Sequence, residues 1–147
     1  MIHAMTIDVE DYWSIISRDH LMILNAQPTD AVVGNTRWFL EVLDQYETKA
    51  TFFILGEVAQ KFPSLVKEIH KDGHEIGVHG FTHKQIFKLS PDEFKQEVVD
   101  CKKVLEDLIS GPVYGHRAPA FSIMPDTKWA LDILCEAGFQ YDSSVFP

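Results

Sequence analysis

The sequence has little of three features that would each point to a class of protein: cysteine, clustered basic residues and long apolar runs. Its 147 residues include two cysteines, Cys101 and Cys135, with no CxxC or zinc-finger spacing. We expect two buried free thiols rather than a disulfide. The 13 Lys and Arg are scattered among 22 Asp and Glu, and the net charge is -9. Nucleic acid is therefore not an expected partner, because binding to phosphates depends on clustered basic side chains.

Membrane and export signals are also missing from the sequence. No stretch approaches the ~20 apolar residues that cross a bilayer, and the first residues, MIHAMTIDVEDYW, carry acids where a signal peptide needs an unbroken apolar run. We therefore expect a cytoplasmic protein without a membrane span. Its 46% hydrophobic and 24% charged residues are typical of one ordinary globular domain.

Strand and helix patterns alternate along the chain. Strands are expected at 2–9, 50–55, 74–78 and 113–117, with a fifth beginning at 139. Helices are expected after Asn35, from Pro63 to Gly73, behind the Ser90–Glu93 capping box to about 109, and over 125–137. Residues 14–34 read as an irregular loop. This alternation predicts the α/β class, with a parallel sheet and right-handed crossovers.

Polar segments follow four of the predicted strands directly. They are DVED (8–11), HGFTH (79–83), RAPAF (117–121) and YDSS (141–144). Parallel α/β folds carry their sites at the carboxyl ends of the strands. We therefore expect these four segments to converge.

Two histidines and a group of acids in these segments suggest a metal site. His79 and His83 are four residues apart, so one helical turn would bring both rings to the same side. Two histidines and one carboxylate form an open catalytic metal set. Asp8 and Glu10 share a strand face, and Asp11 joins them only if the chain turns after residue 9. The alternatives are surface histidines and a solvated acidic turn.

Arg117 is expected to be half-buried beside Ala118 and Pro119, and it then needs an acidic partner, for which Asp8 and Asp142 are the candidates. Phe121 and Trp129 could line a sugar-facing groove, although Trp129 lies on a predicted helix and could equally belong to the core. His74 is assigned no metal role.

The segments TIDVED, ATFFILG, GHEIGVHGFTH, RAPAFS and GFQYDSS, in this order, resemble the polysaccharide deacetylase family, the NodB-homology domains of carbohydrate esterase family 4. The DVED form is similar to the first motif of exopolysaccharide- and exosortase-associated deacetylases. The resemblance implies a distorted, incomplete (β/α) barrel over residues 1–147. It also implies a divalent metal, zinc before cobalt or nickel, and removal of acetyl groups from an N-acetylated glycan.

The same resemblance assigns roles to individual residues. Asp8 matches the catalytic base, which accepts the proton of a water that the metal activates, and Arg117 matches the residue that orients it. His79 and His83 match the metal-binding histidines, with Glu10 or Asp11 as the third ligand because Val9 interrupts the usual acid pair. Trp129 matches a position in the groove wall. Together with Pro119 and Phe121, it makes up the expected substrate-binding set.

The chain departs from the family in one respect. Relatives protonate the leaving amine with a histidine from a later Leu-x-His motif, and no histidine stands in that context before Pro147. We therefore expect a domain that is incomplete at its C-terminus, with an open barrel side that another copy could cover. The alternatives are an amidohydrolase acting on a small cyclic amide, and a non-catalytic metal- or glycan-binding fragment.

Overall fold

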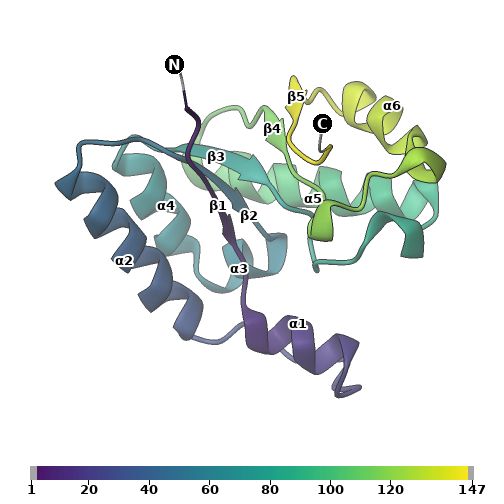
Figure 1. Cartoon of the computed structure of the whole chain (residues 1–147), viewed down its shortest axis with the longest axis horizontal. Coiled ribbons are helices and arrows are strands. Elements are labelled where there is room, and N and C mark those ends of the chain that lie inside the picture. Colours follow the sequence, from purple (N-terminus) through teal and green to yellow (C-terminus); the bar gives the residue numbers. More distant parts are fainter. Residues whose placement is uncertain (1–2, 146–147) are drawn as a thin grey trace.

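The computed structural model describes residues 3–145, and these form one parallel sheet with helices around it (Figure 1). The strands are β1 (Thr6–Val9), β2 (Thr51–Ile54), β3 (Glu75–Val78), β4 (Gly115–His116) and β5 (Tyr141–Asp142), in the order β1-β2-β3-β4-β5. Every neighbouring pair is parallel. The predicted α/β fold is confirmed, and over the described residues the sheet is not closed, as expected for an incomplete barrel.

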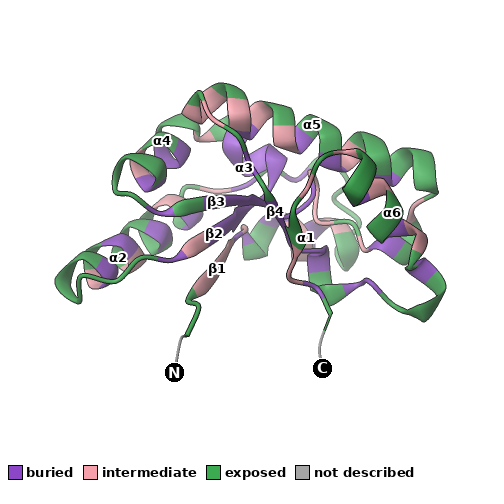
Figure 2. Cartoon of the chain, turned by 90° about the horizontal axis from the view of Figure 1, so that it is seen from above, coloured by how far each residue is buried: buried purple, intermediate pink, exposed green. Residues whose placement is uncertain are grey.

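The helices are α1 (Tyr12–Asp19), α2 (Ala31–Gln45), α3 (Gly56–Lys61), α4 (Pro63–Lys71), α5 (Pro91–Ile109) and α6 (Trp129–Glu136). Apart from α1, which lies below the end of β1 in Figure 1, they form an arc along the sheet, and the two ends of the described chain lie on the other side (Figure 2). Short 3-10 turns are η1 (Ile86–Lys88), η2 (Pro119–Phe121) and η3 (Pro125–Thr127). None of the helices within residues 3–145 has the length and apolar character needed to cross a membrane.

The main hydrophobic core lies between the helices and the face of the sheet that they cover, called here the outer face. Phe52 and Ile54 of β2 and Val78 of β3 are fully buried there with side chains of α3, α4 and α5. A second, smaller cluster between α5 and α6 includes Phe94 and Leu134. Burial of these apolar faces is the main force that holds the helices on the sheet, and it leaves the inner face for other side chains.

On the inner face, two neighbouring glycines lie between two aromatic side chains. The register aligns Asp8, Phe53, Gly77, Gly115 and Tyr141 in one row. A Cβ atom on Gly77 would lie 2.5 Å from the Phe53 ring, and one on Gly115 would collide with the Tyr141 hydroxyl. The rings of Phe53 and Tyr141 thus occupy the space over the two glycines.

The structure corrects several predicted elements. Part of the expected loop over 14–34 is helix α1, and α2 begins at Ala31 behind Asp30, so Asn35 lies inside that helix and does not cap it. Helix α3 was not predicted, and α6 begins at Trp129, after the η3 turn. The first strand begins at Thr6, and the part of its prediction at residue 2 lies outside the described residues.

Other predictions are confirmed. Helix α4 begins at Pro63, and α5 has the expected capping box between Ser90 and Glu93. Both cysteines are free, but only Cys101 is buried; Cys135 is exposed, contrary to expectation.

Candidate metal centre

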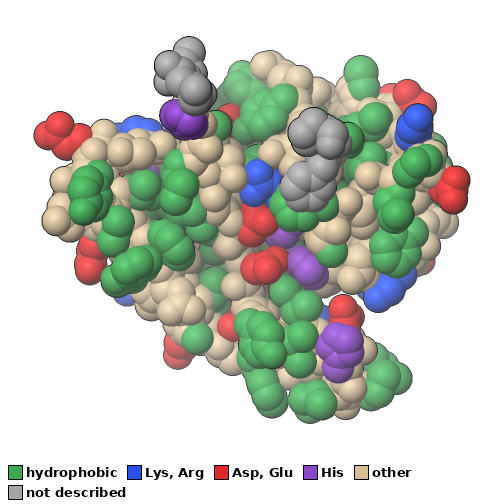
Figure 3. Space-filling view, in the orientation of Figure 1, with side chains coloured by type: hydrophobic (Ala, Val, Ile, Leu, Met, Phe, Trp, Pro, Cys, Tyr) green, Lys and Arg blue, Asp and Glu red, His purple; other side chains and the backbone are tan. Residues whose placement is uncertain are grey.

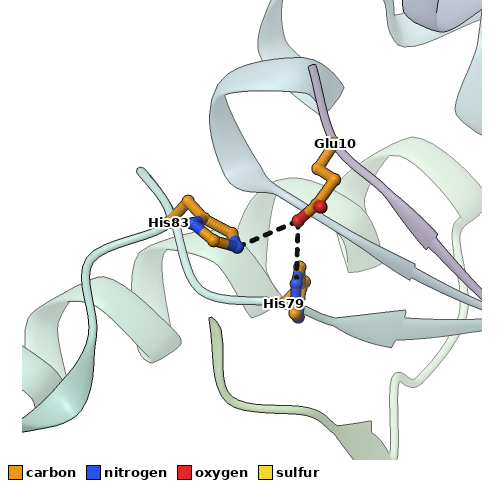
Figure 4. A group of neighbouring side chains, drawn as sticks. All are labelled: Glu10, His79 and His83. Carbon is orange, nitrogen blue, oxygen red and sulfur yellow. Dashed lines mark hydrogen bonds and ion pairs between the residues drawn. The ribbon is translucent and has the colours of Figure 1, made fainter. Parts of the chain in front are cut away.

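Three side chains meet at the carboxyl end of the sheet: Glu10, His79 and His83 (Figure 4). Glu10 Oε2 lies 2.9 Å from His83 Nε2 and 3.2 Å from His79 Nε2. The candidate ligand atoms all lie within 4.8 Å of one another. Figure 3 shows acidic and histidine side chains gathered at the surface near the middle of this face. Two imidazole nitrogens and a carboxylate oxygen form the donor set of an open zinc site, so these residues fit a divalent metal.

The ring of His79 is held in one orientation. Its Nδ1 lies 2.8 Å from the backbone oxygen of Arg117, which can only accept a hydrogen bond, so Nδ1 carries a proton. The other ring nitrogen, Nε2, then faces Glu10 and is the atom that a metal would bind. This is the usual way in which an outer partner prepares a histidine for a metal.

The carboxyl group of Glu10 is strongly acidic. Partial burial acts to raise the pKa of Glu10, but hydrogen bonds and charge from His79 and His83 outweigh it and hold this pKa well below its usual range. Glu10 is therefore an anion at neutral pH, which is the form that binds a metal.

Asp8 lies beside this group and is paired with Arg117. Asp8 Oδ1 accepts a hydrogen bond of 2.8 Å from Arg117 Nη1, and Asp8 Oδ2 lies 3.9 Å from His79 Nε2. Asp8 is thus the acidic partner that Arg117 was expected to need. Asp8 and Glu10 stand two residues apart, which brings both side chains to the inner face of the sheet.

The guanidinium group of Arg117 is held on several sides. Nη2 donates to Thr6 Oγ1 at 3.0 Å and to Ser143 Oγ at 2.8 Å, and the group stacks 4.3 Å from the Phe53 ring centre. A planar, forked cation suits this combination of polar and aromatic partners. Arg117 therefore has a fixed position relative to Asp8.

Asp11 is not placed with the metal group. It caps α1: its Oδ1 accepts from Ser14 N at 2.7 Å, and its Oδ2 accepts from Thr29 Oγ1 at 2.6 Å. The chain turns into the helix after Glu10, which directs the Asp11 side chain back over the first turn of α1. Of the two alternatives for the third ligand, the structure brings Glu10 to the two histidines and places Asp11 at the cap of α1.

The three expected substrate-binding residues lie in different surroundings. Pro119 is buried, and a Cβ on Gly80 would be 3.2 Å from its Cγ, so Pro119 packs on the HGFTH segment. Phe121 is 39% exposed, 5.5 Å from the Arg117 guanidinium. Trp129 packs on the second core cluster, with its ring 5.7 Å from that of Phe94. The core alternative therefore describes Trp129 better than the groove wall.

One buried pair was missed in the sequence. His116 Nδ1 lies 2.7 Å from Asp142 Oδ1, and the His116 ring is completely buried under Phe94 and Phe139. Asp142 also binds Ser144, whose hydroxyl accepts from Ala118 N. The only sequence signal was that both residues stand at the ends of adjacent strands. The pair joins β4 to β5 behind Arg117.

A family model described as polysaccharide deacetylase matches residues 25–141 of the sequence. The chain belongs to the polysaccharide deacetylase family. It is 37% identical over 94 residues to a peptidoglycan-N-acetylglucosamine deacetylase of Bacillus cereus, an alignment that covers 63% of this chain and 34% of that protein. It is 31% identical over 102 residues to the peptidoglycan-N-acetylglucosamine deacetylase PgdA of Listeria monocytogenes, covering 63% and 22%.

Solved structures of polysaccharide deacetylases have the same fold. A Mycobacterium smegmatis protein described as a polysaccharide deacetylase aligns with a TM-score of 0.79 at 26% identity, over 97% of this chain and 50% of that one. The peptidoglycan N-acetylglucosamine deacetylase Bc1960 aligns with a TM-score of 0.69 at 29% identity, over 95% and 54%. The chain thus spans about half the length of these solved relatives and about a third or less of the two curated ones.

Proposed function

We propose that this chain carries the metal site of a hydrolase that removes acetyl groups from N-acetylated amino sugars in a glycan. The observation that carries the proposal is the meeting of Glu10, His79 and His83 beside the Asp8–Arg117 pair. The names of the Bacillus and Listeria relatives make the N-acetylglucosamine of peptidoglycan the first substrate to test.

The three ligands suit zinc, with cobalt or nickel as replacements. When bound there, a divalent cation would acidify a water molecule and polarise the acetyl carbonyl. Glu10 supplies the negative charge of the donor set, and the two histidines supply neutral nitrogens. The half-exposed position of Glu10 leaves the site open on the side where a glycan would approach.

Asp8 is suited to act as the general base. Arg117 holds its Oδ1, so that Oδ2, on the side of His79, is left to accept a proton. A base must lie within hydrogen-bond reach of the proton that it takes, either directly or through the water itself. By fixing one oxygen, Arg117 fixes the direction in which the other points.

A finer assignment within the family rests on the DVED motif. Because Val9 separates Asp8 from Glu10, both acids face the inner side of the sheet, and Asp11 is free to cap α1. This spacing supports our proposal that the chain belongs with the exopolysaccharide-associated deacetylases. The cytoplasmic location and the association of copies stay predictions.

The proposal is tested by metal analysis and by acetate release. We expect the purified chain to retain about one zinc per chain, and Glu10→Ala to lose it. Acetate release is then measured on acetylated chito-oligosaccharides, peptidoglycan and an N-acetylated exopolysaccharide, with this chain and with a longer protein that continues past residue 147. Asp8→Asn should keep the metal and lose the activity.

Each other result has a definite meaning. Zinc binding without acetate release from any glycan, in both proteins, would replace the proposal by a non-catalytic binding module. Hydrolysis of a small cyclic amide instead of the glycans would favour the amidohydrolase alternative.

A further inference from the structure

The turn that leads into His83 is bound by a carboxylate that is not part of the metal group. Glu97 of α5 accepts hydrogen bonds from Phe81 N at 2.9 Å, from Thr82 N at 3.1 Å and from the Thr82 hydroxyl at 2.9 Å. One side chain thus takes three donors from two consecutive residues. Hydrogen bonds to a charged acceptor are about twice as strong as neutral ones.

The opposite side of the same turn is bound by Arg18 of α1. Its Nη2 donates to the backbone oxygen of Thr82 at 3.2 Å, and both Nη atoms bind the Glu57 carboxylate at 2.7 and 2.8 Å. Glu57 is 8% exposed, and its backbone N–H donates to Phe81 O at 3.1 Å. The N–H and C=O groups of Thr82 are therefore held from two helices.

The backbone of this turn needs such support. His83 has a φ of 63°, in the left-handed region, and Gly80 has a φ of 79°. For a residue with a side chain this conformation costs roughly 1–2 kcal/mol. It persists only where surrounding contacts impose it, and such positions cluster at functional sites. Released from its contacts, the turn would relax and move the His83 ring away from Glu10.

We propose that Glu97, assisted by Arg18, is a positioning residue for the metal ligand His83. It holds the turn so that His83 already faces Glu10 and His79 before a cation binds, and binding then loses less freedom. The inference rests on the proposed metal site. Loss of an outer partner of a ligand typically weakens metal binding by about 10–100-fold, which is the effect expected for removal of Glu97.

The test measures the dissociation constant for zinc, by competition with a chromophoric chelator, on the whole chain. Glu97→Ala removes all three contacts and should weaken binding by about 10–100-fold. Glu97→Gln removes the negative charge, as Glu97→Ala does, but keeps an oxygen that can accept from the two N–H groups. Its zinc affinity should therefore be close to that of the wild type. Asp100→Ala is the matched control, because Asp100 is an exposed acid one turn further along α5. The zinc affinity of this variant should match that of the wild type.

A double-mutant cycle separates positioning from a general effect on the fold. In a His83→Ala background, Glu97→Ala should cause no further loss of zinc affinity. The same loss in both backgrounds, wild-type affinity in Glu97→Ala, or a Glu97→Gln chain as weak as Glu97→Ala would each overturn the inference. If Glu97→Ala does not fold, Thr82→Val removes one of the three donors, and wild-type affinity in that variant would overturn it.

The zinc readout is independent of the reaction. If zinc affinity depends on Glu97 but no acetate is released, the proposed function is contradicted and the inference stands. A chain that releases acetate and binds zinc equally well without Glu97 does the reverse. A wild-type chain that binds no zinc overturns the inference too.

Discussion

Arg117 and Asp8 are joined by a 2.8 Å hydrogen bond although β2 and β3 separate their strands in the sheet. The contact is possible because the sheet curls, so that the carboxyl ends of β1 and β4 approach each other across the inner face. Phe53 lies beneath the guanidinium group and excludes water from one side of it. The pair is therefore both part of the candidate site and a link between distant strands.

Removing Arg117 should cost stability as well as function. Arg117→Ala leaves Asp8 half-buried without its cation, and the free energy of unfolding should fall by about 3–5 kcal/mol. Arg117→Lys keeps the charge but not the fork that reaches Thr6 and Ser143, so a smaller loss is expected. Urea unfolding measures both, and a change below about 1 kcal/mol in Arg117→Ala, the range of surface ion pairs, would contradict the prediction.

Glu10 and Asp11 are adjacent acids with separable effects. Asp11→Ala removes the cap of α1 and should lower the free energy of unfolding by about 0.5–2 kcal/mol. Its zinc affinity should stay well above that of Glu10→Ala, which removes a ligand. The check is urea unfolding and zinc competition on the two variants. Equal loss of zinc by both would show that Asp11 also binds the metal.

Stability should depend on pH through His116. Burial lowers the pKa of His116, although Asp142 acts in the opposite direction. Burial has the larger effect because His116 Nε2 has no hydrogen-bond partner among the described residues and the ring lies between Phe94 and Phe139. A proton on that nitrogen would bring an unpaired charge into the core.

The sign follows from linkage. With the folded pKa below the ordinary 6.5, the unfolded chain takes up the proton first as the pH falls. The stabilising contribution is thus complete above pH 6.5 and is lost as the pH falls through the folded pKa. Urea unfolding with EDTA between pH 7.5 and about 5 should show a decline that is smaller in His116→Gln. The exposed His70→Gln is the control, and equal slopes in all three chains would refute the assignment.

Substitution of alanine for Gly77 and for Gly34 should have opposite effects on the free energy of unfolding. Gly77→Ala places a Cβ 2.5 Å from the buried Phe53 ring, and such overpacking typically costs about 1–3 kcal/mol. Gly34→Ala lies in α2 with nothing within 4 Å, and alanine there should stabilise the chain by up to about 1 kcal/mol. Thermal or urea unfolding of the two variants measures the contrast. A Gly77→Ala chain as stable as wild type would mean that Phe53 can move aside.

The strands and their site residues were predictable because their signals are local. A short apolar run followed directly by polar residues marks both the strand and its carboxyl end, and β1 and β3 follow this pattern. The capping box of α5 is equally local. Helix α1 was missed for a physical reason: its buried residues are Ser14 and Ser17, so no apolar stripe marks the face that packs inward.

The rest depended on contacts that the sequence does not show. Glu10 and Asp11 could be told apart only by the direction of the chain after β1. His116 and Asp142 become partners only through the β4–β5 register, in which they pair directly. Glu97 stands in the middle of a long helix, and nothing in its neighbours indicates that it binds the turn before His83.

Helix α1 limits the insertions and deletions that the candidate site can tolerate. Asp11 caps its start behind Glu10, and Arg18 near its end reaches Glu57 and the turn before His83. The length of the helix therefore sets the distance between the segments that carry two candidate metal ligands, Glu10 and His83. One residue inserted into it would rotate Arg18 by about 100° and shift it by about 1.5 Å, away from both partners. In the loop after α1, Arg18 binds only the backbone oxygen of Ala26. Changes in the length of this loop should therefore disturb Arg18 less than an insertion in the helix.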